Sequence, residues 1–239
     1  MSSNKIFDAY FDTRYKHINV FSHEQYENAC RYFERNYGKF LPQDKDAKIL
    51  DIGCGTGFFL YYLKKKGYKN YLGIDISRSQ IEFCKANVTD KVQLIDAFEF
   101  LKEKNEEYSL IMASDLIEHI PKNKVILFLE LVHKALEKGG YLLLRCPNMG
   151  NFFSLYARYA DFTHECGFTE SSLYQVLKTS GFNEVKVFSP KPERVLSIKG
   201  LIRQWLCNLT HHTIRLLYRM QGFRPPKILS PTLIGVAKK

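Results

Sequence analysis

The chain contains 239 residues, of which 45% are hydrophobic, and carries a formal net charge of +10. This length suits one α/β domain with a sizeable core, and the hydrophobic fraction excludes an intrinsically disordered chain. No stretch reaches the roughly 18 consecutive apolar residues of a membrane span, and the N-terminal segment lacks the apolar core of a signal peptide. The positive charge favours an anionic partner, such as a phosphorylated glycan, a nucleic acid or an acidic lipid surface, although a solvated basic surface gives the same total.

The six cysteines are scattered, without the close pairs of a zinc site or a redox motif: Cys30, Cys54, Cys84, Cys146, Cys166 and Cys207. Such spacing is typical of reduced thiols in an intracellular protein. We therefore expect a cytoplasmic protein, and leave open a peripheral contact with the inner face of the membrane.

An N-terminal helix is predicted at residues 23–40, and a linker at residues 41–44 ends it. We assign residues 1–45 to an N-terminal helical cap and residues 46–239 to the main domain. Apolar runs in that domain predict strands at residues 48–53, 71–76, 92–96, 108–114, 141–146, 183–188 and 231–237. Helical spacing predicts helices at residues 57–66, 79–86, 122–136 and 171–180, the last capped by Thr169 and closed by Gly181.

Strands that alternate with helices of this length indicate right-handed crossovers between parallel strands. The predicted fold class is therefore α/β, a doubly wound Rossmann-like sheet with helices on both faces. A basic helical insertion, at about residues 195–225, precedes the last strand.

A glycine-rich turn follows the first predicted strand, with the sequence D-I-G-C-G-T-G at residues 51–57. Glycine is needed where the backbone takes a positive φ and where a ligand lies against it. A dinucleotide-binding loop would have its third glycine at position 58, where this chain has Phe58. The pattern therefore favours a ligand without a pyrophosphate, such as an adenosyl amino acid.

Acidic residues end the next two predicted strands. Asp75 lies where a carboxylate accepts hydrogen bonds from both ribose hydroxyls, and Asp96 where one accepts from an adenine amino group. Apolar surface for the adenine ring comes from Ile76, Ala97 and Phe98. The alternative is that both acids are ordinary turn residues.

Together these motifs resemble the class I S-adenosylmethionine-dependent methyltransferases. The matching sequences are DIGCGTG, GIDIS at residues 73–77, LIDAF at residues 94–98 and LEKGGYLLLRCPN at residues 136–148. The resemblance covers residues 47–190 and the last strand. It implies that Asp51, Gly53 and Gly55 hold the methionine end of the cofactor, Asp75 the ribose and Asp96 the adenine, with Cys54 and Ser114 beside them. It also implies a strand order of 3-2-1-4-5-7-6 with the last strand antiparallel.

A second group of polar residues follows the fourth predicted strand. If a helical turn follows that strand, Asp115, Glu118 and His119 share one face. His164 lies in a loop after the fifth strand, which is expected to cover the same end of the sheet. Two carboxylates and two imidazoles form a candidate site for a divalent metal.

This D-x-x-E-H set with a distant histidine resembles the E-x-x-E-H…H set of plant-type small-RNA 2′-O-methyltransferases and the E-x-x-E-H of ubiquinone-biosynthesis O-methyltransferases. The resemblance implies metal coordination, by magnesium or manganese, through Asp115, Glu118, His119 and His164. A metal-free general base at His119 or His164 is the alternative, because imidazole titrates near neutral pH. Asp115 is counted with these two histidines among the candidate catalytic residues.

The sequence between residues 146 and 182 is similar to methyltransferases from bacterial surface-polysaccharide clusters, with the pattern CPN…D-x-T-H…F-T…S-L…G-F. This resemblance implies O-methylation of a glycan or lipid-linked saccharide. The alternatives are an O-methyltransferase of a quinone-like or other small molecule, and a non-catalytic cofactor-binding or RNA-binding protein.

The predicted insertion contains an amphipathic helix with an apolar face and basic neighbours at residues 201–220. A basic amphipathic helix with a tryptophan is suited to a bilayer interface. Packing on the domain or on a partner subunit is the alternative.

Overall fold

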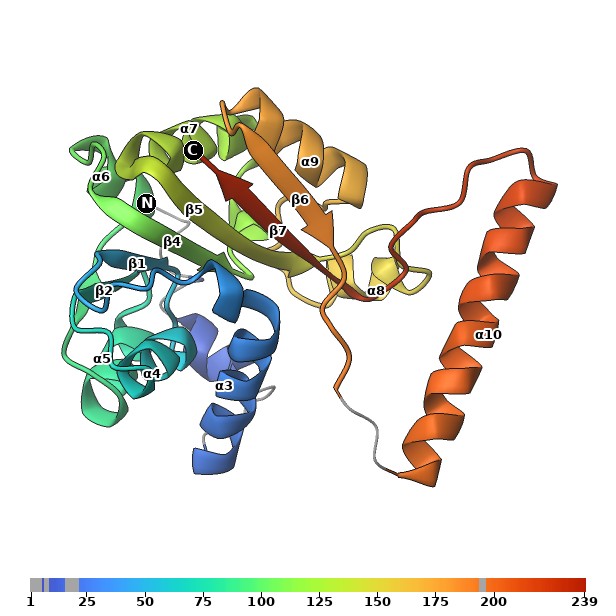
Figure 1. The fold of residues 1–239 in the computed structure, drawn as a ribbon, viewed down its shortest axis with the longest axis horizontal. Coiled ribbons are helices and arrows are strands. Elements are labelled where there is room, and N and C mark those ends of the chain that lie inside the picture. Colours follow the sequence, from blue (N-terminus) through green and yellow to red (C-terminus); the bar gives the residue numbers. More distant parts are fainter. Residues whose placement is uncertain (1–5, 7–8, 16–21, 194–196) are drawn as a thin grey trace.

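The computed structural model describes residues 6, 9–15, 22–193 and 197–239, and most of the N-terminal cap before residue 22 lies outside this part. A seven-stranded sheet has the order β3-β2-β1-β4-β5-β7-β6 (Figure 1). β7 runs antiparallel to β5 and β6, and the other paired strands described are parallel, so the predicted fold and order are confirmed. The strands are β1 Ile49–Ile52, β2 Tyr71–Asp75, β3 Val92–Leu94, β4 Tyr108–Ser114, β5 Leu136–Pro147, β6 Glu184–Phe188 and β7 Thr232–Lys238.

Helices cover both faces of the sheet. The α-helices are α3 His23–Tyr37, α4 Phe58–Lys65, α5 Arg78–Asn87, α6 Ala97–Lys102, α7 Val125–Ala135, α8 Ser154–Tyr159, α9 Glu170–Thr179 and α10 Ile198–Met220. Four short turns complete the described helical elements: η1 Phe11–Tyr15, η2 Gly38–Phe40, η3 Ile117–His119 and η4 Lys122–Lys124.

Two hydrophobic clusters form the core, one on each side of the sheet. Side chains alternate along a strand, so Leu110 and Met112 of β4 face α3, α4 and α5, whereas Ile111 and Ala113 face α6, α7 and α9. Both faces of the sheet are covered, so successive residues of β1 and β4 are buried on either side, which explains why these strands read as continuous apolar runs.

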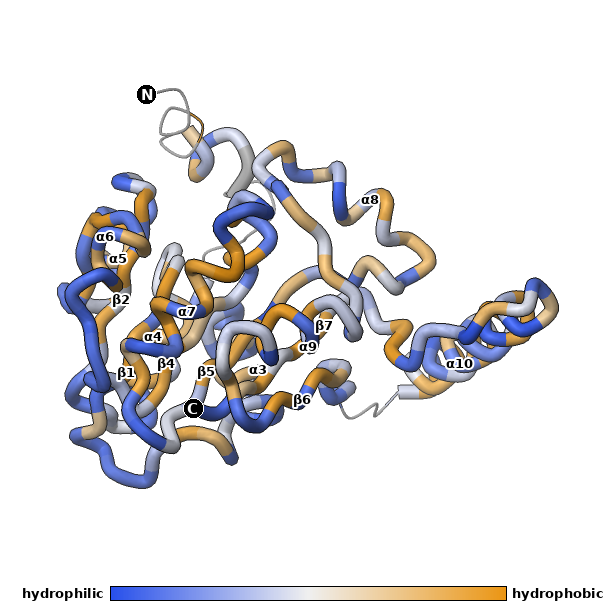
Figure 2. The backbone as a smooth tube through the Cα atoms, turned by 90° about the horizontal axis from the view of Figure 1, so that it is seen from above, coloured by the Kyte–Doolittle hydropathy of each residue, from blue (hydrophilic) through white to orange (hydrophobic). Residues whose placement is uncertain are grey.

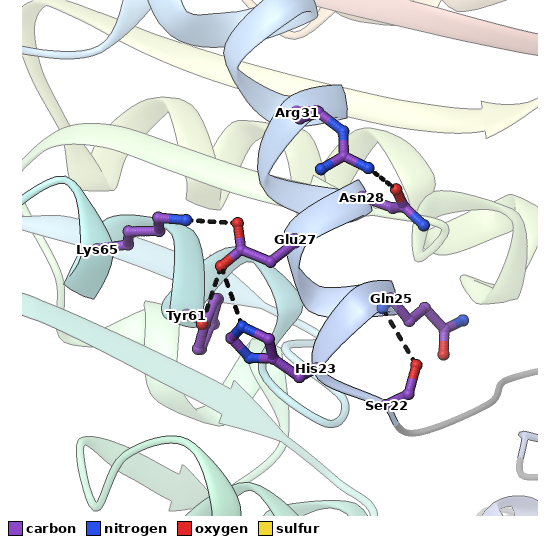
Figure 3. Close-up of polar contacts among 8 residues, drawn as sticks. All are labelled: Ser22, His23, Gln25, Glu27, Asn28, Arg31, Tyr61 and Lys65. Atoms are coloured by element: carbon purple, nitrogen blue, oxygen red, sulfur yellow. Dashed lines mark hydrogen bonds and ion pairs between the residues drawn. The ribbon is translucent and has the colours of Figure 1, made fainter.

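Helix α3 shares the core with the main domain. Phe33 packs on Phe59 of α4, with ring centroids 5.1 Å apart. Polar contacts fix the same pair of helices (Figure 3): Glu27 accepts a hydrogen bond from Tyr61 at 3.2 Å and forms an ion pair with Lys65. The cap therefore packs as part of the body, while a domain boundary at residue 45 stays a prediction.

Gly57 caps α4 at a position that requires glycine. Its φ is +86°, and a Cβ there would lie 2.5 Å from Cys84 Sγ. We expect Gly57→Ala to lower the free energy of unfolding by about 2–5 kcal/mol, from backbone strain and overpacking together. Urea denaturation measures this loss. Gly67→Ala is the matched control, because Gly67 has φ +80° but no atom within 4 Å of the added Cβ.

The control isolates the backbone cost, about 1–2 kcal/mol. Equal losses in the two variants would show that contact with Cys84 contributes nothing.

Several element boundaries differ from the sequence prediction. β3 ends at Leu94, because Asp96 instead caps α6 by accepting hydrogen bonds from the backbone N–H groups of Phe98 and Glu99. Helices α6 and α8 were not predicted. The predicted cap at Thr169 is confirmed as a reciprocal capping box with Ser172.

Helix α10 stands apart from the rest of the molecule (Figure 1). None of its residues is buried. The alternative that the predicted amphipathic helix packs on this chain's own domain is therefore wrong. Within the described residues, no helix combines the length and apolar character needed to cross a membrane.

Candidate active site

The carboxyl ends of the parallel strands open into a cleft of about 1180 Å³. Helix α3 and Tyr10 of the N-terminal segment complete its wall. Every residue proposed from the sequence as cofactor-binding, catalytic or metal-ligating lines this one cleft: Asp51, Gly53, Cys54, Gly55, Asp75, Ile76, Asp96, Ala97, Phe98, Ser114, Asp115, Glu118, His119 and His164. This is the place where open α/β sheets bind ligands.

The glycine turn after β1 is held against β2. The N–H groups of Gly53 and Cys54 donate to the carbonyl oxygen of Ile74 at 2.8 and 3.0 Å. Gly53 and Gly55 have φ values of +69° and +54°, which are accessible to glycine at little cost. Asp75 fastens the turn, because its Oδ2 accepts from the N–H of Gly55 at 2.9 Å.

Two carboxyl groups make this part of the cleft electronegative. Asp51 is buried at the end of β1, and both its burial and the nearby Asp75 raise the pKa of its carboxyl group. Burial also raises the pKa of Asp75, while hydrogen bonds from the N–H groups of Ser77 and Gly55 act in the opposite direction. A cationic ligand group, such as an ammonium, would relieve the repulsion between the two acids.

Asp96 has a structural role that the sequence left as an alternative. Its Oδ1 accepts hydrogen bonds from Phe98 N at 2.8 Å and Glu99 N at 3.2 Å. Its Oδ2 has no hydrogen-bond partner among the described residues, and the residue lines the cleft. The ring of Phe98 is fixed in turn by an edge contact with Phe128 of α7, with centroids 5.9 Å apart.

A cluster of possible metal ligands lines the same cleft as the glycine turn. One ligand atom from each of Glu118, His119 and His164 lies within 4.8 Å of the other two. Glu118 is only 2% exposed, and its Oε2 is buried with no hydrogen-bond partner among the described residues. Burial and the charge of Asp115 raise the pKa of Glu118 well above its usual value.

Hydrogen bonds orient both imidazoles of the cluster. Thr163 Oγ1 donates to Asp161 Oδ1 at 2.6 Å, so it accepts from Nδ1–H of His119 at 2.9 Å. His164 Nδ1 donates to the carbonyl oxygen of Ala157 at 3.0 Å. Each ring therefore presents Nε2 as its lone-pair nitrogen, which is the arrangement of metal-ligating histidines.

The protonation of His119 follows from its surroundings. Burial and the neighbouring His164, with ring centroids 4.9 Å apart, lower the pKa of His119 below its usual value. The imidazole is therefore neutral at pH 7 and is able to accept a proton or bind a cation.

The expected place of Asp115 on the same face is wrong. Its φ is +52°, and the helical turn η3 begins only at Ile117, so Asp115 lies outside the helix that aligns Glu118 with His119. Its carboxylate instead forms a two-pronged ion pair with Arg145 of β5, whose Nε lies 2.9 Å from Oδ1. Asp115 therefore lines the cleft beside the cluster rather than within it.

Sequence reasoning missed the groups that support the cluster. Asp161 and Thr163 belong to the D-x-T-H pattern of the sequence, and this pattern is the one signal that points to them. Tyr10 was not singled out, although its hydroxyl donates to Asp161 Oδ2 at 2.7 Å and its ring lies 6.2 Å from that of His119.

Comparisons with known proteins agree with this geometry. A family model described as "Methyltransferase domain" matches residues 21–187. The ubiquinone biosynthesis O-methyltransferase of Bartonella quintana is 29% identical over 126 residues, covering 51% of this chain and 49% of that protein. The malonyl-[acyl-carrier protein] O-methyltransferase of Priestia megaterium is 27% identical over 176 residues, covering 72% and 62%. The chain thus spans about half the length of the first of these relatives.

Two solved structures share the fold. A SAM-dependent methyltransferase from Archaeoglobus fulgidus has a TM-score of 0.67 and 25% identity, covering 90% of this chain and 94% of that one. A phosphoethanolamine N-methyltransferase 2 from Haemonchus contortus has a TM-score of 0.61 and 16% identity, covering 98% and 60%.

Proposed function

Because this chain belongs to the methyltransferase domain family and has the class I S-adenosylmethionine-dependent methyltransferase fold, we propose that it transfers a methyl group from that cofactor to a hydroxyl group. The acceptor is a glycan or lipid-linked saccharide of the cell surface. The observation that carries the proposal is the Glu118–His119–His164 cluster in the same cleft as the glycine turn.

The residues of the cleft fit this cofactor. Asp51 and the glycine turn would hold its cationic methionine end, because two acids and the turn form an electronegative recess there. Asp75 would accept from the ribose hydroxyls and Asp96 from the adenine amino group. Bound there, the cofactor supplies a methyl group that its sulfonium has already activated.

The cluster supports a hydroxyl acceptor rather than an amine. A hydroxyl must lose its proton during transfer, and Nε2 of His119 or of His164 is a suitable acceptor for that proton. The protein must also hold the acceptor oxygen about 3–3.5 Å from the methyl carbon and in line with the bond that breaks.

The same three side chains also fit a divalent cation, since one carboxylate and two oriented imidazoles supply a set of ligands. The imidazoles favour manganese over magnesium, which prefers oxygen ligands. A metal ion held there would lower the pKa of an acceptor hydroxyl.

We expect manganese to raise the melting temperature of the wild-type protein, and Glu118→Gln to abolish that rise. Binding at about 100 times the dissociation constant stabilises the folded state by about 2.7 kcal/mol, or about 5–10 °C for a chain of this size. Differential scanning fluorimetry measures the shift. Glu165→Gln is the control, because Glu165 lines the cleft but is not part of the cluster. An unshifted wild type would exclude the metal and leave the general base.

Exposed aromatic side chains beside the cleft support a large acceptor. Phe162 lines the cleft and is 90% exposed. The preceding segment exposes further large apolar residues: Phe152, Phe153, Leu155, Tyr156 and Tyr159. Apolar patches of this kind mark interaction sites. Similarity to the ubiquinone biosynthesis O-methyltransferases favours a quinone-like or other small molecule with a hydroxyl group as the second candidate acceptor.

A methyl-transfer assay with isotopically labelled cofactor tests the proposal. Cell-envelope glycan fractions and a catechol-type phenol are offered separately. Label in the glycan fraction, as base-stable ether, supports the first acceptor, and label in the phenol alone supports the second. Cofactor binding without transfer to either would favour a non-catalytic protein.

A further inference from the structure

Helix α10 exposes an apolar face that runs along most of its length and is interrupted only around His212 and Thr213. Residues at helical spacing on this face include Ile198, Ile202, Trp205, Leu209, Leu216 and Met220, and all are exposed. Trp205 is 63% exposed and Met220 74%. Figure 2 shows hydrophobic and hydrophilic residues alternating along this detached helix. So large an unpartnered apolar surface indicates that something covers it.

The charged side chains of α10 and of the chain that follows it are all positive. No aspartate or glutamate follows Glu193 in the sequence. The positive residues of α10 lie at the edges and on the back of the apolar face: Lys199, Arg203, Arg215 and Arg219. Arg224 and Lys227 follow in the connection to β7. The surface is therefore complementary to an anionic partner.

These charges argue against a second copy of α10 as the cover. Two such helices packed face to face would bring the basic residues at the edges of their apolar faces together, with no acidic side chain in residues 197–239 to pair with them. The chain's own domain does not cover the helix either. A helix of 23 residues is about 34 Å long, but α10 is not apolar enough to cross a bilayer.

We infer that α10 is an interfacial membrane helix, which lies in the plane of an anionic bilayer with its apolar face among the acyl chains. Lys199, Arg203, Arg215 and Arg219 contact the anionic headgroups around it. This arrangement accounts for three features of α10: its exposed apolar face, its exclusively positive charged side chains and its separation from the domain. The inference goes beyond the proposed reaction and does not depend on the acceptor.

Trp205 is the only tryptophan of the chain, so intrinsic fluorescence reports on α10 directly. The full-length protein is mixed with vesicles of phosphatidylcholine alone, or of phosphatidylcholine with phosphatidylglycerol, without cofactor or acceptor. With the anionic vesicles we expect a blue shift of the emission and co-flotation of the protein. Both should weaken at high salt, because charge attraction is screened.

Leu209→Glu should weaken vesicle binding about tenfold or more, because it removes a leucine that the bilayer would bury and adds a charge to the apolar face. Asn208→Asp is the matched control, since it adds the same charge at an exposed position on the polar face. It should keep most of the binding. His119→Ala should bind vesicles as wild type does, which separates this inference from the proposed reaction.

Three results would overturn the inference. The first is an unshifted emission and no flotation with anionic vesicles at low salt. The second is equal binding to neutral vesicles. The third is a blue shift without vesicles that grows with protein concentration and is lost in Leu209→Glu, which would assign the face to self-association.

Discussion

His119→Ala and His164→Ala are each expected to lower kcat by about 10²–10⁴-fold, the range typical for loss of a general base. The affinity for the cofactor should stay within about twofold of the wild-type value. The two imidazoles lie in the same cleft as the glycine turn but belong to a separate group of residues. Their loss should therefore affect the chemical step and not cofactor binding. Steady-state kinetics and calorimetry measure the two effects.

His212→Ala is the control, because His212 is exposed on α10 and far along the chain from the cluster. Wild-type turnover in both cluster variants would show that the site is structural and that the catalytic assignment is wrong.

A chelator distinguishes a metal site from a metal-free general base at these histidines. A metal enzyme should lose activity in EDTA and regain it with manganese. A metal-free base should be insensitive to EDTA and should show an acid limb in its pH–rate profile. Because burial and His164 lower the pKa of His119, that limb should lie below the usual histidine pKa of about 6.5. Activity is then retained as the pH rises above the limb and lost as it falls.

The gathering of the predicted cofactor-binding residues in one cleft was predictable, because these residues lie at or next to the ends of parallel strands. Asp51 is the penultimate residue of β1, Asp75 ends β2 and Asp96 follows β3, and the carboxyl ends of parallel strands meet at one edge of a sheet. The approach of His164 to Glu118 and His119 was predictable for a similar reason, since a loop after β5 must return over the same edge.

Contacts that depend on backbone detail were not predictable. A regular helical turn after β4 would place Asp115 on the same face as Glu118 and His119. Asp115 instead has a positive φ, and its carboxylate pairs with Arg145. The support of His119 by Thr163 and Asp161 joins residues more than forty positions apart, and no local pattern specifies it. Amphipathic spacing identified α10 as a helix, yet such spacing does not say what covers the apolar face.

Asp75→Ala is expected to weaken binding of S-adenosylmethionine by about 1.5–3 kcal/mol, which is about 10- to 150-fold in the dissociation constant. Two effects contribute. The variant loses the carboxylate predicted to accept from the ribose hydroxyls. It also loses the bond from Gly55 N to Oδ2 that fastens the glycine turn, and the bond from Ser77 N to Oδ1 at 2.8 Å.

A cofactor analogue without ribose hydroxyls separates these effects. If Asp75 binds the ribose, the analogue should bind the wild type weakly and lose little further affinity in Asp75→Ala, because the partner groups are already absent. If Asp75 only positions the turn, both ligands should lose the same factor. Asp90→Ala is the control, since Asp90 is an exposed turn acid outside the cleft. Calorimetry that finds unchanged affinity for S-adenosylmethionine in Asp75→Ala would remove Asp75 from the binding site.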